Sequence, residues 1–133
     1  MFNSDNSLVV RTDYSDEKAW KELRLAIERP VGDQAYVEYL EDPELSNLSA
    51  EQIQLFLPKS FDHSAIFIVD RESLSHPDCP ILVVDLFEQP GRKFRVVPSE
   101  MWAVENNLAI ANMDFSEFAD NVDEDGIFRG FKE

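Results

Sequence analysis

The sequence predicts an α/β or α+β fold in which a mixed β-sheet of about five strands packs against about three or four helices. The chain has 133 residues, which is the length of one ordinary domain. Apolar segments of strand length alternate with amphipathic helical segments in its first half, and a hairpin signal follows in its second half. We therefore expect residues 1–133 to form a single domain, with residues 1–6 as a flexible N-terminus.

The first two elements are a strand and a helix. SLVVRTD is rich in β-branched residues and predicts a strand near residues 8–12. SDEKAWKELRLAIERP then predicts a helix with Ser15 as its N-cap, and Pro30 ends it. Large apolar side chains recur at helical spacing along one face of this helix: Trp20, Leu23 and Ile27.

A strand, a short helix and a further strand follow. AYVEYL predicts a strand near residues 35–40. In LSAEQIQLF, Ser49 and Gln52 have the spacing of a capping box at the start of a helix. AIFIVD predicts a strand near residues 65–69, and we expect this strand to be central because it is too apolar for an exposed position.

The segments ILVVDLF and FRVV predict a hairpin around EQPGRK, with Pro90–Gly91 as the central pair of a tight turn. Two cross-strand registers stay open. A loop of about five residues sets Asp85 opposite Arg95, and a loop of about two residues sets Glu88 opposite Lys93.

Two helices are predicted in the last third of the chain. SEMWAVENN predicts a helix with Ser99 as its cap, and the following LAIA is either a brief strand or a connector. MDFSEFADNV predicts a helix with a capping box of Asp114 and Glu117. Beyond this helix, we expect three large apolar side chains to hold the tail against the body: Ile127, Phe128 and Phe131. The alternation of strands and helices predicts parallel crossovers, and the hairpin adds an antiparallel pair.

The charge of the chain excludes some partners. The sequence contains 27 acidic and 12 basic residues, which gives a net charge of −15 at pH 7. Such a surface repels phosphate backbones and anionic lipids, so we expect neither nucleic acid nor a membrane as a partner. The charge either keeps the protein soluble or steers it toward a basic partner.

The sequence also indicates a location in the cell. No apolar run approaches the roughly 20 residues of a membrane helix. MFNSDNS has no basic residue before an apolar core, and the single cysteine, Cys79, allows no internal disulfide. We therefore expect an intracellular, cytoplasmic protein. A neighbouring carboxylate raises a thiol pKa, so we interpret Cys79 as a packing residue.

Three aspartates are candidate catalytic residues. Asp13, Asp70 and Asp85 lie at or near the ends of apolar runs. If those strands are parallel neighbours, the three carboxylates converge at the carboxyl ends of the strands, where they could hold magnesium or keep one carboxyl protonated as a general acid. The alternative is that each aspartate is an ordinary turn or cap residue.

The end of the chain resembles half of a calcium loop. Asn121, Asp123 and Asp125 alternate before Gly126, but Lys132 stands at the position where such a loop needs a bidentate glutamate. We therefore interpret the stretch as an acidic helix exit, and we predict neither a metal site nor a cofactor.

Candidate partner-binding residues lie in two places. Trp102 is displaced by about 100° from the expected buried face of its helix and could anchor a partner, with Glu105 beside it. The alternative is that another element covers Trp102. The acidic helix exit contributes the other candidates: Asp123, Glu124 and Asp125.

Two stretches of the chain resemble a known family. RTDYSDEKAW and FRVVPSEMWAVENNLAIANMDFSEFADNVDEDGIFRGF are similar to small bacterial proteins classed only as a domain of unknown function. The resemblance implies a stand-alone bacterial intracellular protein, and it carries over no catalytic or binding residue.

Three functions remain open from the sequence. We favour a non-enzymatic interaction module that binds a basic protein, by analogy with immunity proteins and inhibitors. A magnesium-dependent hydrolase that uses Asp13, Asp70 and Asp85 is the second hypothesis. The third is an oligomeric scaffold element, and the sequence does not indicate an oligomeric state.

Overall fold

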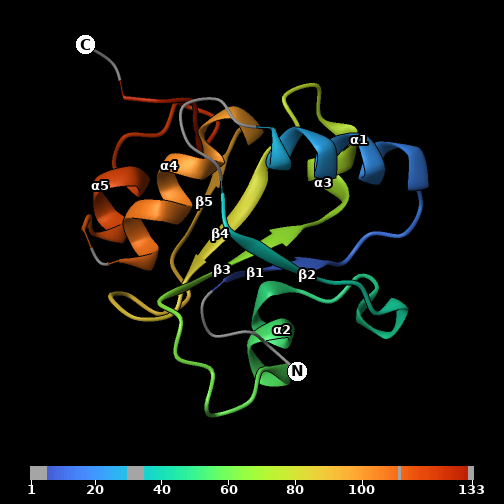
Figure 1. Cartoon of the computed structure of the whole chain (residues 1–133), viewed down its shortest axis with the longest axis horizontal. Coiled ribbons are helices and arrows are strands. Elements are labelled where there is room, and N and C mark those ends of the chain that lie inside the picture. Colours follow the sequence, from blue (N-terminus) through green and yellow to red (C-terminus); the bar gives the residue numbers. More distant parts are fainter. Residues whose placement is uncertain (1–5, 30–34, 111, 132–133) are drawn as a thin grey trace.

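The computed structural model describes residues 6–29, 35–110 and 112–131. In this part of the chain, one mixed sheet of six strands has the order β2-β1-β3-β4-β5-β6 (Figure 1). The strands are β1 (Ser7–Arg11), β2 (Val37–Leu40), β3 (Ala65–Val69), β4 (Ile81–Asp85), β5 (Lys93–Val96) and β6 (Ile127–Phe128). The predicted mixed sheet is confirmed, with β3 in a central position and one strand more than expected.

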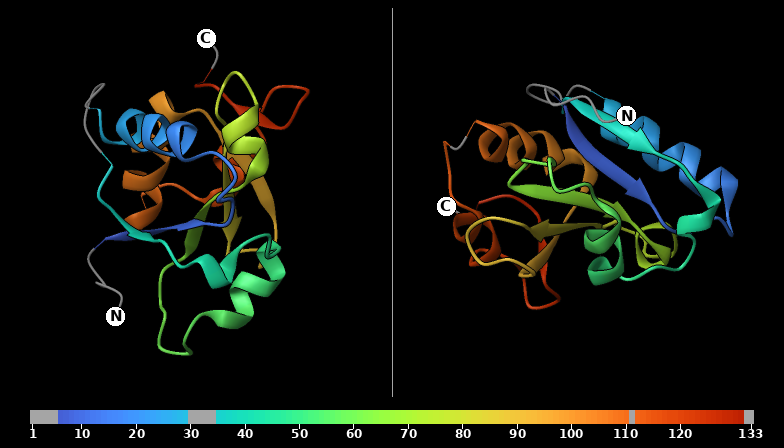
Figure 2. Two further views of the ribbon diagram at one scale, coloured as in Figure 1. Left: turned by 90° about the vertical axis from the view of Figure 1, so that its right-hand side faces the viewer. Right: turned by 90° about the horizontal axis from the view of Figure 1, so that it is seen from below.

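Helices cover both faces of the sheet (Figure 2). The described helices are α1 (Glu17–Glu28), α2 (Ala50–Phe56), α3 (Arg71–Ser75), α4 (Pro98–Ala109) and α5 (Phe115–Ala119), with a 3₁₀ turn, η1 (Pro43–Leu45), before α2. The larger core lies between the sheet and α1, α4 and α5, and the smaller core lies on the opposite face beneath α2. No described helix has the length and apolar character that a membrane crossing requires.

The strand directions define two edges of the sheet. β1 pairs in parallel with β2 and β3, β4 is antiparallel to β3 and β5, and β6 is parallel to β5. The predicted parallel crossovers and the antiparallel hairpin are therefore confirmed. We call the edge at which β1, β2, β3, β5 and β6 end the carboxyl edge. The amino edge is the opposite one, where β4 ends.

The two crossovers of the parallel half run in opposite directions along the sheet. From β1 the chain runs through α1 to β2 on one side, and it then returns through α2 to β3 on the other side (Figure 1). α1 packs on one face and α2 on the other. In open α/β sheets, the carboxyl ends of strands at such a reversal are the usual ligand site.

Two of the predicted helix starts are confirmed. The Ser49 side chain accepts a hydrogen bond from the N–H of Gln52, and the Gln52 side chain accepts one from the N–H of Ser49. The same reciprocal box joins Asp114 and Glu117 at the start of α5. These residues satisfy backbone N–H groups that the first helical turn leaves without a partner.

Two other predicted caps are wrong. Asp16 caps α1 in place of Ser15, because its side chain accepts the hydrogen bond from the N–H of Ala19. Ser99 lies inside α4, which begins at Pro98, a residue whose fixed φ and missing N–H suit the first helical position. Of LAIA, the first two residues belong to α4. The predicted helix end at Pro30, residues 1–5 of the expected flexible terminus, and Lys132 lie outside the described residues.

The connection between β4 and β5 confirms its turn but corrects its register. Pro90–Gly91 is the central pair of a tight turn that a backbone hydrogen bond of 2.9 Å closes, and the glycine has a φ of 93°. Neither predicted pair forms, because the register sets apolar residues opposite the two basic ones: Leu82 with Arg95, and Val84 with Lys93. The Asp85 carboxylate instead binds the backbone of the connection itself, and the Glu88 carboxylate binds the start of α5.

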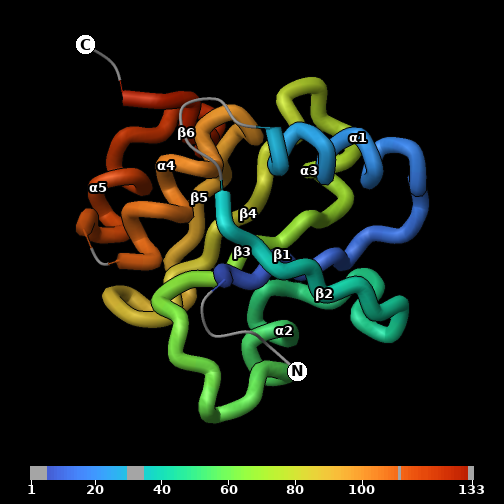
Figure 3. Tube along the Cα trace, viewed as in Figure 1, coloured from blue at the N-terminus to red at the C-terminus, as the bar shows by residue number. Residues whose placement is uncertain are grey.

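An aromatic cluster holds the tail, as predicted. Ile127 and Phe128 are 1% and 0% exposed in β6. The ring of Phe128 lies 5.3 Å from that of Phe118 and 6.5 Å from that of Phe94. Phe131 is 52% exposed, yet its ring is 5.0 Å from that of Phe128. Figure 3 follows the chain from α5 back to the sheet at β6.

Candidate functional site

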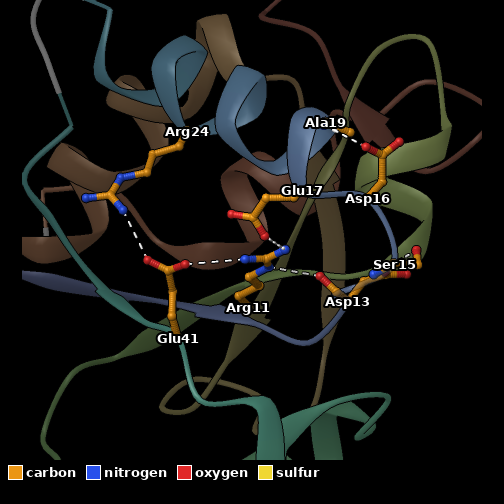
Figure 4. A network of polar contacts seen from close by, with 8 residues as sticks. All are labelled: Arg11, Asp13, Ser15, Asp16, Glu17, Ala19, Arg24 and Glu41. Carbon is orange, nitrogen blue, oxygen red and sulfur yellow. Dashed lines mark hydrogen bonds and ion pairs between the residues drawn. The ribbon is translucent and has the colours of Figure 1, made fainter.

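Asp13 lies at the carboxyl edge, in the loop that joins β1 to α1 (Figure 4). The residue is 4% exposed. Its carboxylate accepts hydrogen bonds from the backbone N–H of Ser15 at 2.7 Å and from the Ser15 hydroxyl at 2.5 Å. Both bonds are local, so Asp13 closes the turn into α1 in the manner of a cap residue.

A buried arginine, Arg11, lies beside this loop (Figure 4). Its Nε donates to the carbonyl oxygen of Asp13 at 2.9 Å, and its guanidinium group lies 3.0 Å from Glu17 and 3.4 Å from Glu41. Glu41 also pairs with Arg24 at 3.1 Å. These contacts join the ends of β1 and β2 to α1.

Aromatic rings cover the same guanidinium group. Its carbon lies 4.1 Å from the ring centre of Tyr14 and 4.9 Å from that of Trp20, so both rings provide cation–π contacts to Arg11. A buried arginine needs such neighbours, because an uncompensated charge in the interior is strongly destabilising. We therefore interpret the network as a structural junction. The sequence signal was a single arginine at the end of an otherwise apolar strand.

Asp70 also lies at the carboxyl edge, directly after β3. Its carboxylate caps α3 by accepting a hydrogen bond from the backbone N–H of Ser73. It also forms a bidentate ion pair with the guanidinium group of Arg95, with N–O distances of 2.9 and 2.7 Å. Burial raises the pKa of Asp70, but the hydrogen bonds and charge of Arg95 outweigh burial and leave the pKa below its ordinary value. Asp70 is therefore ionised at neutral pH and engaged by a residue of β5.

Asp85 lies at the amino edge, because β4 runs against β3 and sets Asp85 opposite Ala65 at the start of β3. It is 1% exposed. Its carboxylate accepts hydrogen bonds from the backbone N–H groups of three successive residues in the β4–β5 connection: Phe87, Glu88 and Gln89. Asp85 therefore shapes this connection.

The three aspartates do not converge, because the condition of parallel neighbouring strands is met for only two of them. Asp13 and Asp70 follow parallel neighbouring strands, but Asp85 ends an antiparallel strand at the other edge of the sheet. Within residues 6–29, 35–110 and 112–131, no group of three or more His, Cys, Asp or Glu side chains could hold a metal ion. The arrangement gives a magnesium-dependent reaction no shared carboxylate site in this part of the chain.

Glu105 is not a surface residue, which corrects the prediction that it faces a partner. It is 2% exposed on α4. Its carboxylate accepts hydrogen bonds from the Ser7 hydroxyl at 2.7 Å and from the backbone N–H of Tyr36 at 2.8 Å. The position of Glu105 on α4 directs it to the start of β1, so Glu105 ties α4 to the sheet.

Trp102 is partly buried and packs against the larger core. Its indole N–H is buried and has no hydrogen-bond acceptor within the described part of the chain. Another part of the protein therefore covers Trp102 in part, which is the alternative that the sequence left open.

The acidic helix exit is organised around one arginine. Arg129 pairs with Asp123 at 2.7 Å and with Asp125 at 2.8 Å, and it also reaches Asp78 at 2.7 Å. Its hydrogen bonds hold the pKa of Asp125 below the ordinary value. Gly126, at a φ of 82°, lets the chain turn back into β6, while Glu124 is exposed. The predicted acidic exit thus carries an internal counter-charge.

Cys79 lies in a hollow of about 540 Å³ at the carboxyl edge, between α1, the start of α4 and the end of β6. Burial, together with Asp78 and Glu22, raises the pKa of the thiol. The thiol is therefore protonated at neutral pH, which suits the packing role expected for this cysteine. The same hollow contains Arg29 and Arg129, of which Arg129 is engaged by the carboxylates described above.

A second hollow, of about 80 Å³, lies at the amino edge between the β4–β5 connection and the segment that joins α4 to α5. We call it the amino-edge hollow. Its lining contains the apolar residues Leu108, Met113 and Phe115 and the acidic residues Asp85, Glu88 and Asp114. Asp85 is buried, whereas Glu88 and Asp114 are exposed and form an acidic rim. Phe87 also lines it and is 80% exposed. It therefore combines exposed apolar surface with negative charge.

Sequence reasoning missed Phe87 because the segment ILVVDLF placed it at the end of a predicted strand. In the structure β4 ends at Asp85, so Phe87 lies in the β4–β5 connection instead. Ile110, which directly follows α4, is also 74% exposed. Phe87 differs from a scattered surface residue because it lines a hollow together with other apolar residues, as at an interaction site.

Comparisons with known proteins give a family but no activity. Residues 6–131 match the model of a protein family that is described as "Domain of unknown function (DUF6924)". A search of curated proteins finds no significant match.

Proposed function

We infer the function of this chain from its own residues, because it belongs to the DUF6924 family, whose description assigns no activity. We propose that the protein is a non-enzymatic interaction module that binds a basic protein. The proposal extends to a bacterial, cytoplasmic setting, as in the immunity proteins and inhibitors to which it is analogous.

The observation that carries the proposal is the amino-edge hollow. Phe87, which lines the hollow, exposes 80% of its surface, while the whole chain has a net charge of −15. An apolar centre with a charged rim is the usual anatomy of a protein–protein interface, and the excess of carboxylates selects a partner of opposite charge.

No observation favours the two alternatives. The hydrolase hypothesis required Asp13, Asp70 and Asp85 to share a site, and Asp85 lies at the opposite edge. Asp13 and Asp70 are also engaged by Ser15 and Arg95. The scaffold hypothesis needs a self-complementary surface, whereas the acidic surface of one copy repels that of another.

The test begins with tagged protein expressed in its native cells and ends with purified components. We expect one basic protein to co-purify, to leave the complex at high salt, and to rebind at a one-to-one ratio when both components are pure. Measured by calorimetry, the dissociation constant should rise about tenfold or more between 50 and 200 mM NaCl, because charge pairing contributes to binding.

An unrelated acidic protein of similar size and net charge is the control. If it captures the same protein with a similar dissociation constant, binding reflects charge alone. Recovery of no protein that rebinds in purified form would refute the proposed function.

A further inference from the structure

We propose that the amino-edge hollow receives one apolar side chain from a basic amphipathic segment of the partner, while lysine or arginine residues of that segment contact the acidic rim. This inference rests on the proposed function and names the surface and the kind of segment that carry it out.

The walls of the hollow are held in place before any partner arrives. The Glu88 carboxylate joins them, since it accepts hydrogen bonds from the backbone N–H of Phe115 at 3.1 Å and from the Ser116 hydroxyl at 3.4 Å. On the other side, the Asp85 carboxylate accepts hydrogen bonds from three backbone N–H groups of the β4–β5 connection. The backbone N–H of Leu86 also donates to the carbonyl oxygen of Ser64 at 2.8 Å. A preformed site loses little conformational freedom on binding.

The size of the hollow fits one side chain. The centre of a water-sized sphere can occupy about 80 Å³ inside this hollow. About 10–15 Å³ of that space is enough for one water molecule, so the hollow has room for several. Leu108, Met113 and Phe115 provide its apolar lining. An inserted aliphatic or aromatic group therefore displaces several water molecules from an apolar surface, which favours binding.

The rim fits a cation. Residues 85–92 and 112–120 contain four exposed carboxylates, in addition to the buried Asp85, and one arginine. That arginine, Arg92, already pairs with Asp120. Glu88 and Asp114 are exposed and lie directly at the hollow. The charge complement of this rim is a segment with lysine or arginine on either side of its apolar anchor.

The test uses a designed peptide as the probe. It contains about 18 residues of leucine and lysine, placed so that the leucines form one face of a helix. A peptide of the same composition in scrambled order lacks that face, and a leucine–glutamate peptide reverses the charge. Binding to the full chain is measured by calorimetry, and the binding surface is mapped from NMR amide shifts.

We expect the leucine–lysine peptide to bind and to shift the amides of residues 85–91 and 112–117. Phe87→Ser should weaken binding about tenfold, as expected for a central anchor. Leu55→Ser is the matched control, because Leu55 is 87% exposed and lies on α2, across the sheet from α4 and α5. The control should change the dissociation constant less than twofold. The scrambled peptide should bind at least about tenfold more weakly, and the leucine–glutamate peptide should not bind.

Equal binding by Phe87→Ser and the original protein would overturn this inference, as would shifts centred on α2 or equal binding of the scrambled peptide. The purified natural partner separates the two proposals. If it binds Phe87→Ser as tightly as the original protein, the interaction function stands and the assigned surface is wrong. If no partner rebinds in purified form, the proposed function itself fails. Circular dichroism of each variant establishes that a weaker affinity does not come from unfolding.

Discussion

At the scale of single residues, the buried carboxylates have structural partners. Asp13 binds Ser15, Asp85 binds three N–H groups, and Glu105 binds Ser7 and Tyr36. A buried ionised group is stable only when hydrogen bonds or opposite charges replace its water. The residues that look most reactive in the sequence therefore stabilise the fold.

Asp70→Asn should lower the free energy of unfolding at pH 7 by about 2 kcal/mol, because Arg95 then keeps its charge in a partly buried position without its partner. The folded-state pKa of Asp70 is lower than its ordinary value of 3.8. The contribution of ionised Asp70 to the free energy of unfolding is therefore fully present above pH 3.8, and it is lost as the pH falls through the folded-state pKa.

Urea unfolding at pH 7 and pH 3 measures this effect. The difference between Asp70→Asn and the original protein should be smaller at pH 3 than at pH 7. Glu72→Gln is the control, since Glu72 lies 3.5 Å from Arg95 but is half exposed, and it should change the free energy by less than about 0.5 kcal/mol. A difference that grows on acidification would contradict the assignment of this pair.

Glu105→Ala should destabilise the protein by about 2 kcal/mol, because the hydroxyl of Ser7 and the N–H of Tyr36 lose their acceptor in the interior. Chemical denaturation measures the change, and Glu124→Ala, at an exposed position, is the control. If Glu105→Ala left stability unchanged and weakened partner binding instead, the buried role would be wrong.

At the scale of elements, sequence patterns predicted what depends on neighbours along the chain. The capping boxes at Ser49 and Asp114 and the Pro90–Gly91 turn need only nearby residues, and all three form. Three described elements were missed: α3, β6 and the 3₁₀ turn η1. β6 has two residues and exists because its backbone pairs with β5, which lies about thirty positions earlier in the sequence.

In the candidate site, too, local features could be predicted from the sequence and long-range ones could not. Three aspartates at strand ends are visible in the sequence, but whether they meet depends on strand direction, and the antiparallel β4 carries Asp85 to the other edge. Phe87 and Leu108 lie far apart in the chain and line one hollow only because α4 packs back across the sheet. Long-range packing of this kind leaves no local sequence signal.

Ser49→Ala should cost about 1 kcal/mol, because the first turn of α2 loses the side-chain acceptor for the N–H of Gln52. Thermal unfolding checks this as a lower melting temperature. Ser60→Ala, at an exposed position outside the helices, is the control and should leave the temperature nearly unchanged. An equal fall in both variants would argue against the cap.

At the scale of the whole molecule, charge governs behaviour. The net charge of −15 lies on a chain of 133 residues, and like charges on a folded surface repel one another. Local ion pairs such as those of Arg129 offset only part of this repulsion.

The free energy of unfolding should therefore rise when NaCl is raised from 10 to 150 mM. Over that range the screening length falls from about 30 to about 8 Å, which weakens long-range repulsion more than close pairs. Urea denaturation at both salt concentrations is the measurement. A free energy that stays constant or falls would show that the ion pairs outweigh the repulsion.

The outer strands of the sheet bear on the risk of fibril growth. β6 has two residues and offers little backbone for another chain to extend, but β2 has four residues and its outer side faces away from the sheet. Glu38 lies in β2, so a second copy that docked there would bring like charges together on every added strand. The acidity that we assign to recognition thus also opposes self-templated polymerisation.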